Sequence, residues 1–235
     1  MLALFKLALL VSLTIETAIA IDAECTKPAD MVGISYEIIK KNKPTGDIIS
    51  RETMNFWRMR DQVVYEYEAR QYAEIWNLVS NGQIRPVRYF DEFKQGIEYQ
   101  PMDVNDGKGD KNWSAKNNIV SEQLRQQLTQ DSVSGEGCEQ IISYSQKQAL
   151  SLKTVRWLSY YQLPESMQFF NNGVVIEWQA LQIISDPEII QQAFNQRSHY
   201  KTTDYADIGD NESNPVISKM IHQGFTELHG GHGDH

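Results

Sequence analysis

Apolar and polar residues alternate along the first part of the chain, from about residue 32 to residue 100. Ile34, Tyr36 and Ile38, for example, alternate with the polar residues Ser35 and Glu37, which is typical of a β-strand with one buried face. The clearest turn is Asn81-Gly82, because Asn-Gly suits the two left-handed positions of a type I′ turn. Five or six such strands joined by short turns predict an antiparallel meander.

The pattern changes after residue 102. Residues 103–118 are polar and rich in turn formers, which predicts a loop, and Ile119, Val120, Leu124 and Leu128 then recur at helical spacing. They predict one amphipathic helix of about three turns. Further strands follow at residues 141–144, 153–160, 167–170 and 174–184. The last two flank Asn171-Asn172-Gly173, a second hairpin signal, while Gln162-Leu163-Pro164 interrupts the strand pattern before them.

The last part of the chain is predicted to be helical. Ser185 and Glu188 have the spacing of a capping box, with Pro187 in the first turn. Ser213 and Pro215 open a second helix with an apolar stripe of Ile217, Met220, Ile221, Phe225 and Leu228. The fold class is therefore mainly β (α+β). We expect a large curved antiparallel sheet or half-barrel, with a few helices packed on one face.

This order of a meander, a helix and a second meander resembles the periplasmic lipoprotein-carrier family and its half-barrel relatives. The resemblance covers about residues 32–184 and is one of architecture, so it carries over no functional residues. It implies a concave apolar cavity that holds a lipid or acyl group.

The N-terminus has the features of a cleavable signal peptide. Lys6 precedes an apolar run over residues 7–13, and Ala18-Ile19-Ala20 fits the small-x-small rule for cleavage after residue 20, with residue 23 as the second choice. The apolar run is shorter than the roughly 20 residues that cross a bilayer. The sequence predicts a signal peptide over residues 1–20, a single globular domain over 21–228 and a periplasmic or secreted protein without a membrane span.

The net charge argues against two classes of partner, and the cysteine content predicts a disulfide. The net charge of −9 argues against a nucleic-acid partner and against electrostatic attachment to an anionic membrane. Cys25 and Cys138 are the only cysteines, and in an oxidising compartment such a pair is most simply a disulfide.

Aromatic residues are frequent on the predicted strands. The candidates for lining a ligand cavity are Trp57, Tyr65, Tyr67, Trp76, Tyr89, Trp157 and Trp178. Ligand pockets are mostly apolar and aromatic, which favours this assignment. The alternative is that the same residues form the core between sheet and helices, because aromatic residues are ordinary strand formers.

Residues 229–235 form a His/Gly-rich tail that we expect to be flexible. Its candidate ligands for a divalent transition metal such as copper, zinc or nickel are His229, His232 and His235, with His222 as a fourth. The alternative is a solvated terminus with incidental metal affinity. A flexible tail lacks the rigid ligand shell of a catalytic metal site, so metal capture or storage is the more plausible of the two metal functions.

These observations leave three hypotheses for function. The first is a soluble exported binding or carrier protein that holds an apolar or amphiphilic small molecule or docks an envelope protein. The second is an envelope metal-binding protein that uses the tail. The third is a hydrolytic enzyme, although no catalytic signature is present and His199 is the only histidine before residue 222.

Overall fold

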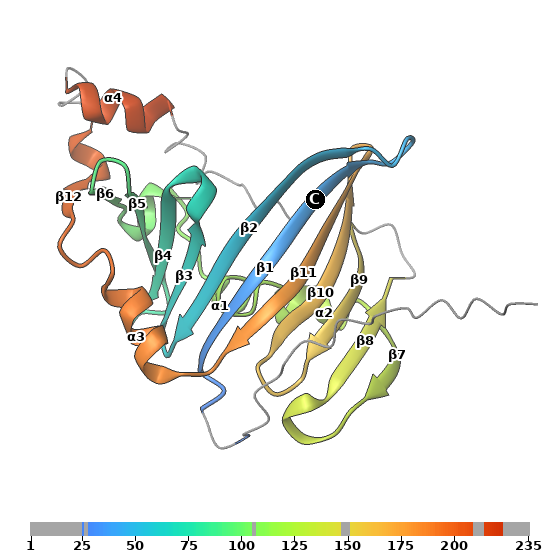
Figure 1. Cartoon of the computed structure of the whole chain (residues 1–235). Coiled ribbons are helices and arrows are strands. Elements are labelled where there is room, and N and C mark those ends of the chain that lie inside the picture. The colour runs from blue at the N-terminus through green and yellow to red at the C-terminus, as the bar shows by residue number, and fades with distance from the viewer. Residues whose placement is uncertain (1–24, 26–27, 105–106, 147–150, 209–213, 223–235) are drawn as a thin grey trace, which may run out of the picture.

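The computed structural model describes residues 25, 28–104, 107–146, 151–208 and 214–222. Within them, twelve strands form one strongly curved sheet in the order β12-β6-β5-β4-β3-β2-β1-β11-β10-β9-β8-β7 (Figure 1). All neighbouring strands are antiparallel except β12 and β6, which are parallel. The predicted fold class, mainly β with a large curved sheet and few helices, is confirmed.

The sheet consists of two meanders joined at one seam. The first meander contains β1 (Met31–Asn42), β2 (Ile48–Met59), β3 (Gln62–Tyr67), β4 (Tyr72–Leu78), β5 (Ile84–Phe90) and β6 (Gln95–Glu98). The second contains β7 (Thr129–Ser134), β8 (Ile141–Ser145), β9 (Leu152–Leu158), β10 (Leu163–Asn171) and β11 (Val174–Ile184). Strand β11 pairs with β1, and β12 (Lys201–Asp204) adds to β6 at the far edge. Both predicted Asn-Gly hairpins are confirmed, between β4 and β5 and between β10 and β11.

The predicted helix over residues 119–128 is wrong in its bounds. The structure instead has two short helices, α1 (Trp113–Asn118) and α2 (Glu122–Gln126), and α1 lies in the predicted loop. Two separate caps explain the division, because Asn112 accepts a hydrogen bond from the backbone N–H of Ala115 and Ser121 accepts one from that of Leu124. Ile119 between them has a positive φ of 65°, which no helix continues through.

Three further details differ from the sequence prediction. Pro164 does not end a strand but lies near the start of β10, beside a register irregularity where a missing N–H is tolerated. Strands β7 and β12 were not predicted. The cap of the first C-terminal helix, α3 (Pro187–Asn195), is Asp186 rather than Ser185, because the Asp186 side chain accepts from the first free backbone N–H groups.

The second C-terminal helix is α4 (Pro215–His222), which begins at the predicted proline. Ile217 and Met220 of its predicted stripe are buried against the end of the sheet. The side chain of Ile221, and all of Phe225 and Leu228, lie outside the described part of the chain. Within the residues that the structure describes, there are also four short 3₁₀ segments, at Glu68–Arg70, Pro101–Asp103, Gly137–Glu139 and Tyr205–Asp207. Among the described residues, no helix is long and apolar enough to cross a membrane.

Helices pack on both faces of the sheet, whereas the sequence predicted them on one face, because Trp57 and Val64 give β2 and β3 an apolar patch on the second face as well. On the face that we call inner, α1 and α2 pack on alternate residues such as Phe56, Tyr65 and Trp157. On the opposite, outer face, α3 packs through Ile190 against Trp57 and its neighbours. Helix α3 crosses the outer face at the ends of β1 and β2 (Figure 1).

Two features fix the start of the chain to the sheet. Cys25 and Cys138 form the predicted disulfide, with Cα atoms 5.5 Å apart. Arg58 is buried on the inner face and donates hydrogen bonds to the carbonyls of Ala29 (2.7 Å), Asn117 (3.0 Å) and Tyr161. Burial opposes the charged form and lowers the pKa of Arg58 to about 10.

Candidate functional site: a polar cleft beside helix α3

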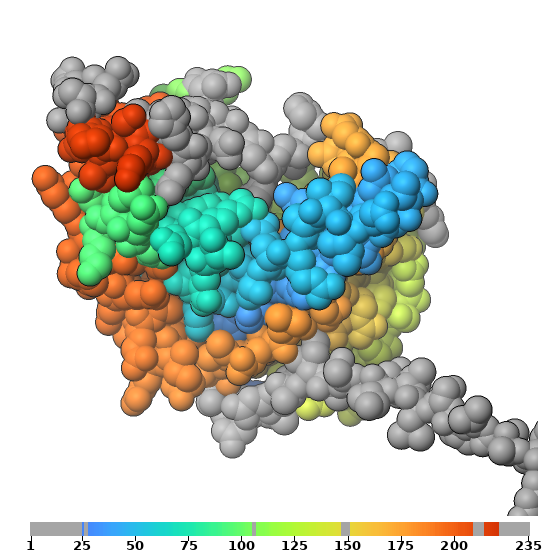
Figure 2. Space-filling model, turned by 45° about the horizontal axis from the view of Figure 1, so that its top comes forward, coloured from blue at the N-terminus to red at the C-terminus, as the bar shows by residue number. Residues whose placement is uncertain are grey.

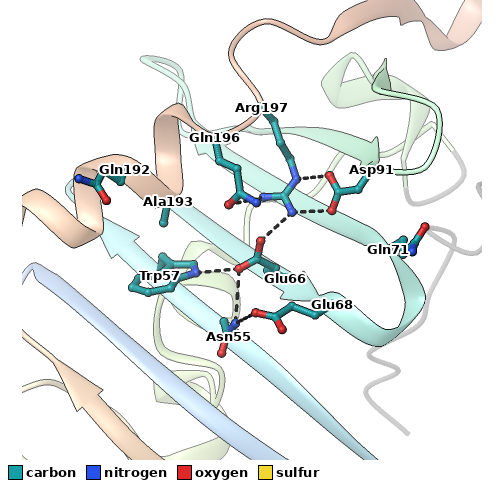
Figure 3. Close-up of a pocket in the computed structure, with 10 residues that line it drawn as sticks. All are labelled: Asn55, Trp57, Glu66, Glu68, Gln71, Asp91, Gln192, Ala193, Gln196 and Arg197. Carbon is teal, nitrogen blue, oxygen red and sulfur yellow. Dashed lines mark hydrogen bonds and ion pairs between the residues drawn. The ribbon is translucent and has the colours of Figure 1, made fainter.

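A cleft of about 710 Å³ opens on the outer face between β2, β3 and the C-terminal end of α3 (Figure 3). Its lining consists of Asn55, Trp57, Glu66, Glu68, Gln71, Asp91, Gln192, Ala193, Gln196 and Arg197. Eight of these ten residues carry a charge or a carboxamide, so the cleft is a polar site with one aromatic side chain.

Strand pairing places the floor of the cleft. Asn55 of β2 lies opposite Glu66 of β3, and Trp57 lies opposite Val64, so all four side chains share the outer face. The indole of Trp57 lies against the backbone of Gly33 in β1 and donates from Nε1 to Glu66 Oε2 at 3.3 Å. The floor is therefore a fixed aromatic ring beside a hydrogen-bonded carboxylate.

Arg197 closes one side of the cleft from the segment that follows α3. Its Nη2 donates to Glu66 Oε1 at 2.6 Å and to Asp91 Oδ2 at 2.6 Å, and its Nε donates to Asp91 Oδ1 at 2.7 Å. Burial acts to lower the pKa of Arg197, but the hydrogen bonds to Asp91 and Glu66 outweigh it, so the pKa is raised. The buried, charged guanidinium thus links the segment after α3 to β3 and to the end of β5 through hydrogen bonds.

The charges that line the cleft do not balance. Three carboxylates, those of Glu66, Glu68 and Asp91, face the single guanidinium of Arg197, a net charge of −2. Arg197 already binds two of these carboxylates, so little of its hydrogen-bonding capacity is left for an anionic ligand. Glu68 is exposed and accepts from Asn55 Nδ2 at 2.9 Å. Such a cleft favours ligands that donate hydrogen bonds or carry positive charge.

Three glutamines supply the upper walls. Gln192 and Gln196 lie near the end of α3, and Gln71 lies in the turn before β4, and all three are exposed. A carboxamide can donate and accept hydrogen bonds, so these residues can adapt to a polar ligand above the fixed floor.

The seven aromatic residues that were predicted to bind a ligand lie in different parts of the structure. Tyr65, Tyr67 and Trp76 are buried in the inner-face core, and Trp157 is buried in the core beside α2. Those four positions are the ones expected of core residues, which was the alternative assignment. The remaining three are Trp57, in the polar cleft, Tyr89, against Tyr200 on the outer face, and Trp178, beside Tyr36. Trp178 also borders a smaller cleft of about 220 Å³ across β1, β9, β10 and β11.

The predicted metal site lies at the limit of the structure. His229, His232 and His235 lie outside the described residues, and His222 ends α4 with a side chain that is not described. In the described part of the chain, no group of three or more His, Cys, Asp or Glu residues is arranged to hold a metal ion. Metal binding by the tail therefore stays a prediction.

Sequence reasoning missed Glu66, Asp91 and Arg197, which form the centre of the cleft. Arg197 lies 131 residues from Glu66 and 106 from Asp91 along the chain, so no local spacing connects them. One signal was present: Glu66 in β3 and Glu68 directly after the strand stand two residues apart, which marks a polar patch on one face.

Comparison with known proteins gives only distant likenesses. No family model matches the chain, and no curated protein matches it. One solved structure, described as a "putative outer membrane lipoprotein-sorting protein domain" from Vibrio parahaemolyticus, matches with a TM-score of 0.36 and 9% identity. The match covers 72% of this chain and 91% of that one.

Two structures of PNGF-II match with a TM-score of 0.42 and 9% identity. They cover 79% and 81% of this chain but only 34% and 33% of PNGF-II, so this chain spans about a third of that protein's length. None of these likenesses transfers a ligand or an activity to this chain.

Proposed function

We propose that the protein is an exported binding protein that holds a small organic cation in the cleft beside α3. The observation that supports this most is the surplus of carboxylates over guanidinium in the lining. Inside a cleft with protein walls, surplus negative charge attracts a cation and repels an anion more strongly than in open water. The signal peptide expected at residues 1–20 supports export.

The uncharged residues of the cleft suit the same ligand class. The indole of Trp57 is the kind of aromatic surface that attracts ammonium and guanidinium groups. The carbonyl oxygens of Gln71, Gln192 and Gln196 are acceptors for several N–H donors at once. This lining favours an amine over the apolar or amphiphilic ligand that the sequence resemblance implied.

Calorimetric titration tests the proposal directly. The purified protein is titrated with spermidine and choline as cations, glucose as a neutral polar molecule and inorganic phosphate as an anion. We expect binding of at least one cation and no binding of glucose or phosphate. Preference for glucose or phosphate, or no binding of any amine, would contradict the proposal.

A matched pair of variants assigns the binding to the cleft. Glu68→Gln removes one cleft charge from an exposed position, and we expect it to weaken cation binding by about 3- to 10-fold, or about 0.7 to 1.4 kcal/mol. Glu92→Gln removes the same charge from an exposed residue outside the lining and should leave the affinity unchanged. Equal effects of both variants would show that only the overall charge of the protein matters.

A further inference from the structure

The tip of the β1–β2 hairpin carries two neighbouring exposed isoleucines. Ile48 is 55% exposed and Ile49 is 57% exposed, although both begin a strand whose other end is buried in the core. The register shifts between Lys40 and Lys41, so Ile49 is the extra residue of a β-bulge. Bulges change the direction of side chains and often occur at functional positions. The apolar tip is therefore a built feature of the hairpin.

The β10–β11 hairpin lies beside this tip. The backbone N–H of Lys43 donates to the carbonyl of Gly173 at 2.9 Å, and the Lys43 ammonium lies 3.6 Å from the centre of the Phe170 ring. Phe170, Val174 and Val175 are only half-buried. Figure 2 shows the two tips together at one end of the molecule, across from α4. We call residues 37–51 and 168–177 the tip surface.

The tip surface differs in charge from the rest of the protein. It contains four basic side chains, Lys40, Lys41, Lys43 and Arg51, against three acidic ones, whereas the whole chain has a net charge of −9. Lys41 pairs with Glu177 and Arg51 pairs with Glu37. The third acidic residue is Asp47, so the tip surface has a net charge of +1, and Lys40 and Lys43 flank the exposed isoleucines in the hairpin. The tip surface is therefore apolar and slightly basic, although the chain as a whole is acidic.

We propose that the tip surface docks on an anionic lipid bilayer. Ile48 and Ile49 would enter the boundary between headgroups and acyl chains, where apolar side chains are removed from water. Lysine stems extend along an apolar surface while their ammonium groups stay at the headgroups, which adds electrostatic attraction to anionic lipid. In Figure 1 the two hairpin tips project together at one end of the sheet, where they can reach into the surface layer of a bilayer.

Vesicle co-sedimentation tests this proposal, with the protein purified from its own host. Vesicles of phosphatidylcholine alone are compared with vesicles that contain one part phosphatidylglycerol to three parts phosphatidylcholine, at low and at physiological salt. We expect at least tenfold stronger binding to the anionic vesicles, weakened by salt. Equal binding to both vesicle types, or binding to neither, would overturn the proposal, and the second result would direct the search to a protein partner.

Variants locate the contact and separate it from the cleft. The double variant Ile48→Ser with Ile49→Ser should lose binding to anionic vesicles at least tenfold, while its circular dichroism spectrum stays that of the parent. Leu181→Ser changes an apolar residue that is 51% exposed on β11, away from the tip, and should bind like the parent. Glu68→Gln should also leave vesicle binding unchanged, because this proposal is independent of the cleft. Full binding by the double variant would overturn the assignment to the tip surface.

Discussion

Trp57 lies closely against Gly33 at the floor of the cleft. A Cβ atom added at Gly33 would lie 2.4 Å from two ring carbons of Trp57, which is far inside van der Waals contact. The ring cannot move aside easily, because it is buried and held through Nε1 by Glu66. The absence of a side chain at Gly33 is what lets the indole lie flat on β1.

We therefore expect Gly33→Ala to lower the free energy of unfolding by about 1 to 3 kcal/mol, as other overpacking changes do. It should also weaken ligand binding, because the displaced indole moves Glu66. Urea denaturation followed by circular dichroism gives the first quantity and calorimetric titration the second. Adding Trp57→Leu should recover part of the lost stability, since the two residues contact each other. An unchanged urea midpoint for Gly33→Ala would contradict the contact.

At the scale of single residues, the sequence predicted which side chains interact only where a residue has few candidate partners. Cys25 and Cys138 could be paired because they are the only two cysteines in a chain that is predicted to be exported. Arg197 could not be paired, because 31 acidic residues are available and its partners are fixed only by the fold. Buried ion clusters of this kind become visible when the strand register is known.

Helix α3 is the element that connects the cleft to the core of the outer face. Its two adjacent isoleucines have opposite environments, because Ile190 is fully buried against Trp57 and Val64 whereas Ile189 is 45% exposed. The same helix then leads into Gln196 and Arg197, so its position fixes one wall of the cleft.

These two isoleucines form a matched test of α3 packing. Ile190→Ala should lower the free energy of unfolding by about 2 to 4 kcal/mol through lost contacts and a residual cavity. Ile189→Ala should change it by no more than about 0.5 kcal/mol. Both are measured by urea denaturation, and equal losses would show that α3 does not pack as described.

Elements with strong local signals were predicted and the others were not. Strands with period-two alternation and Asn-Gly turns depend on neighbouring residues, so their positions could be inferred. Strand β7 was missed because its residues are nearly all exposed and carry no apolar alternation. Strand β12 was missed because its parallel partner, β6, lies about a hundred residues earlier in the chain. The helix over 119–128 failed because capping by Ser121 competes with apolar spacing.

At the scale of the whole molecule, the disulfide connects the start of the domain to its middle, because Cys25 and Cys138 are 113 positions apart in the sequence. In the chain-entropy account, closing so long a loop restricts the unfolded chain by about 4 to 5 kcal/mol. We expect Cys25→Ser and Cys138→Ser to lower the free energy of unfolding by a similar amount, and by the same amount as each other. Urea denaturation of both variants and of the reduced parent measures it. Full stability of the reduced parent would show that the sheet does not depend on this bond.

The single seam between β1 and β11 also determines when the protein can complete its fold. Within each meander, paired strands are close together in the sequence. Pairing of β1 with β11 instead joins residues far apart, such as Glu37 and Gln179, and is possible only after β11 has formed. Pairing across such a separation is slow, because the loop entropy is lost before the contacts form. Until then the edge of β1 is an open template for pairing with other chains. Because Arg197 follows β11 in the chain, we expect the cleft beside α3 to be completed among the last steps of folding.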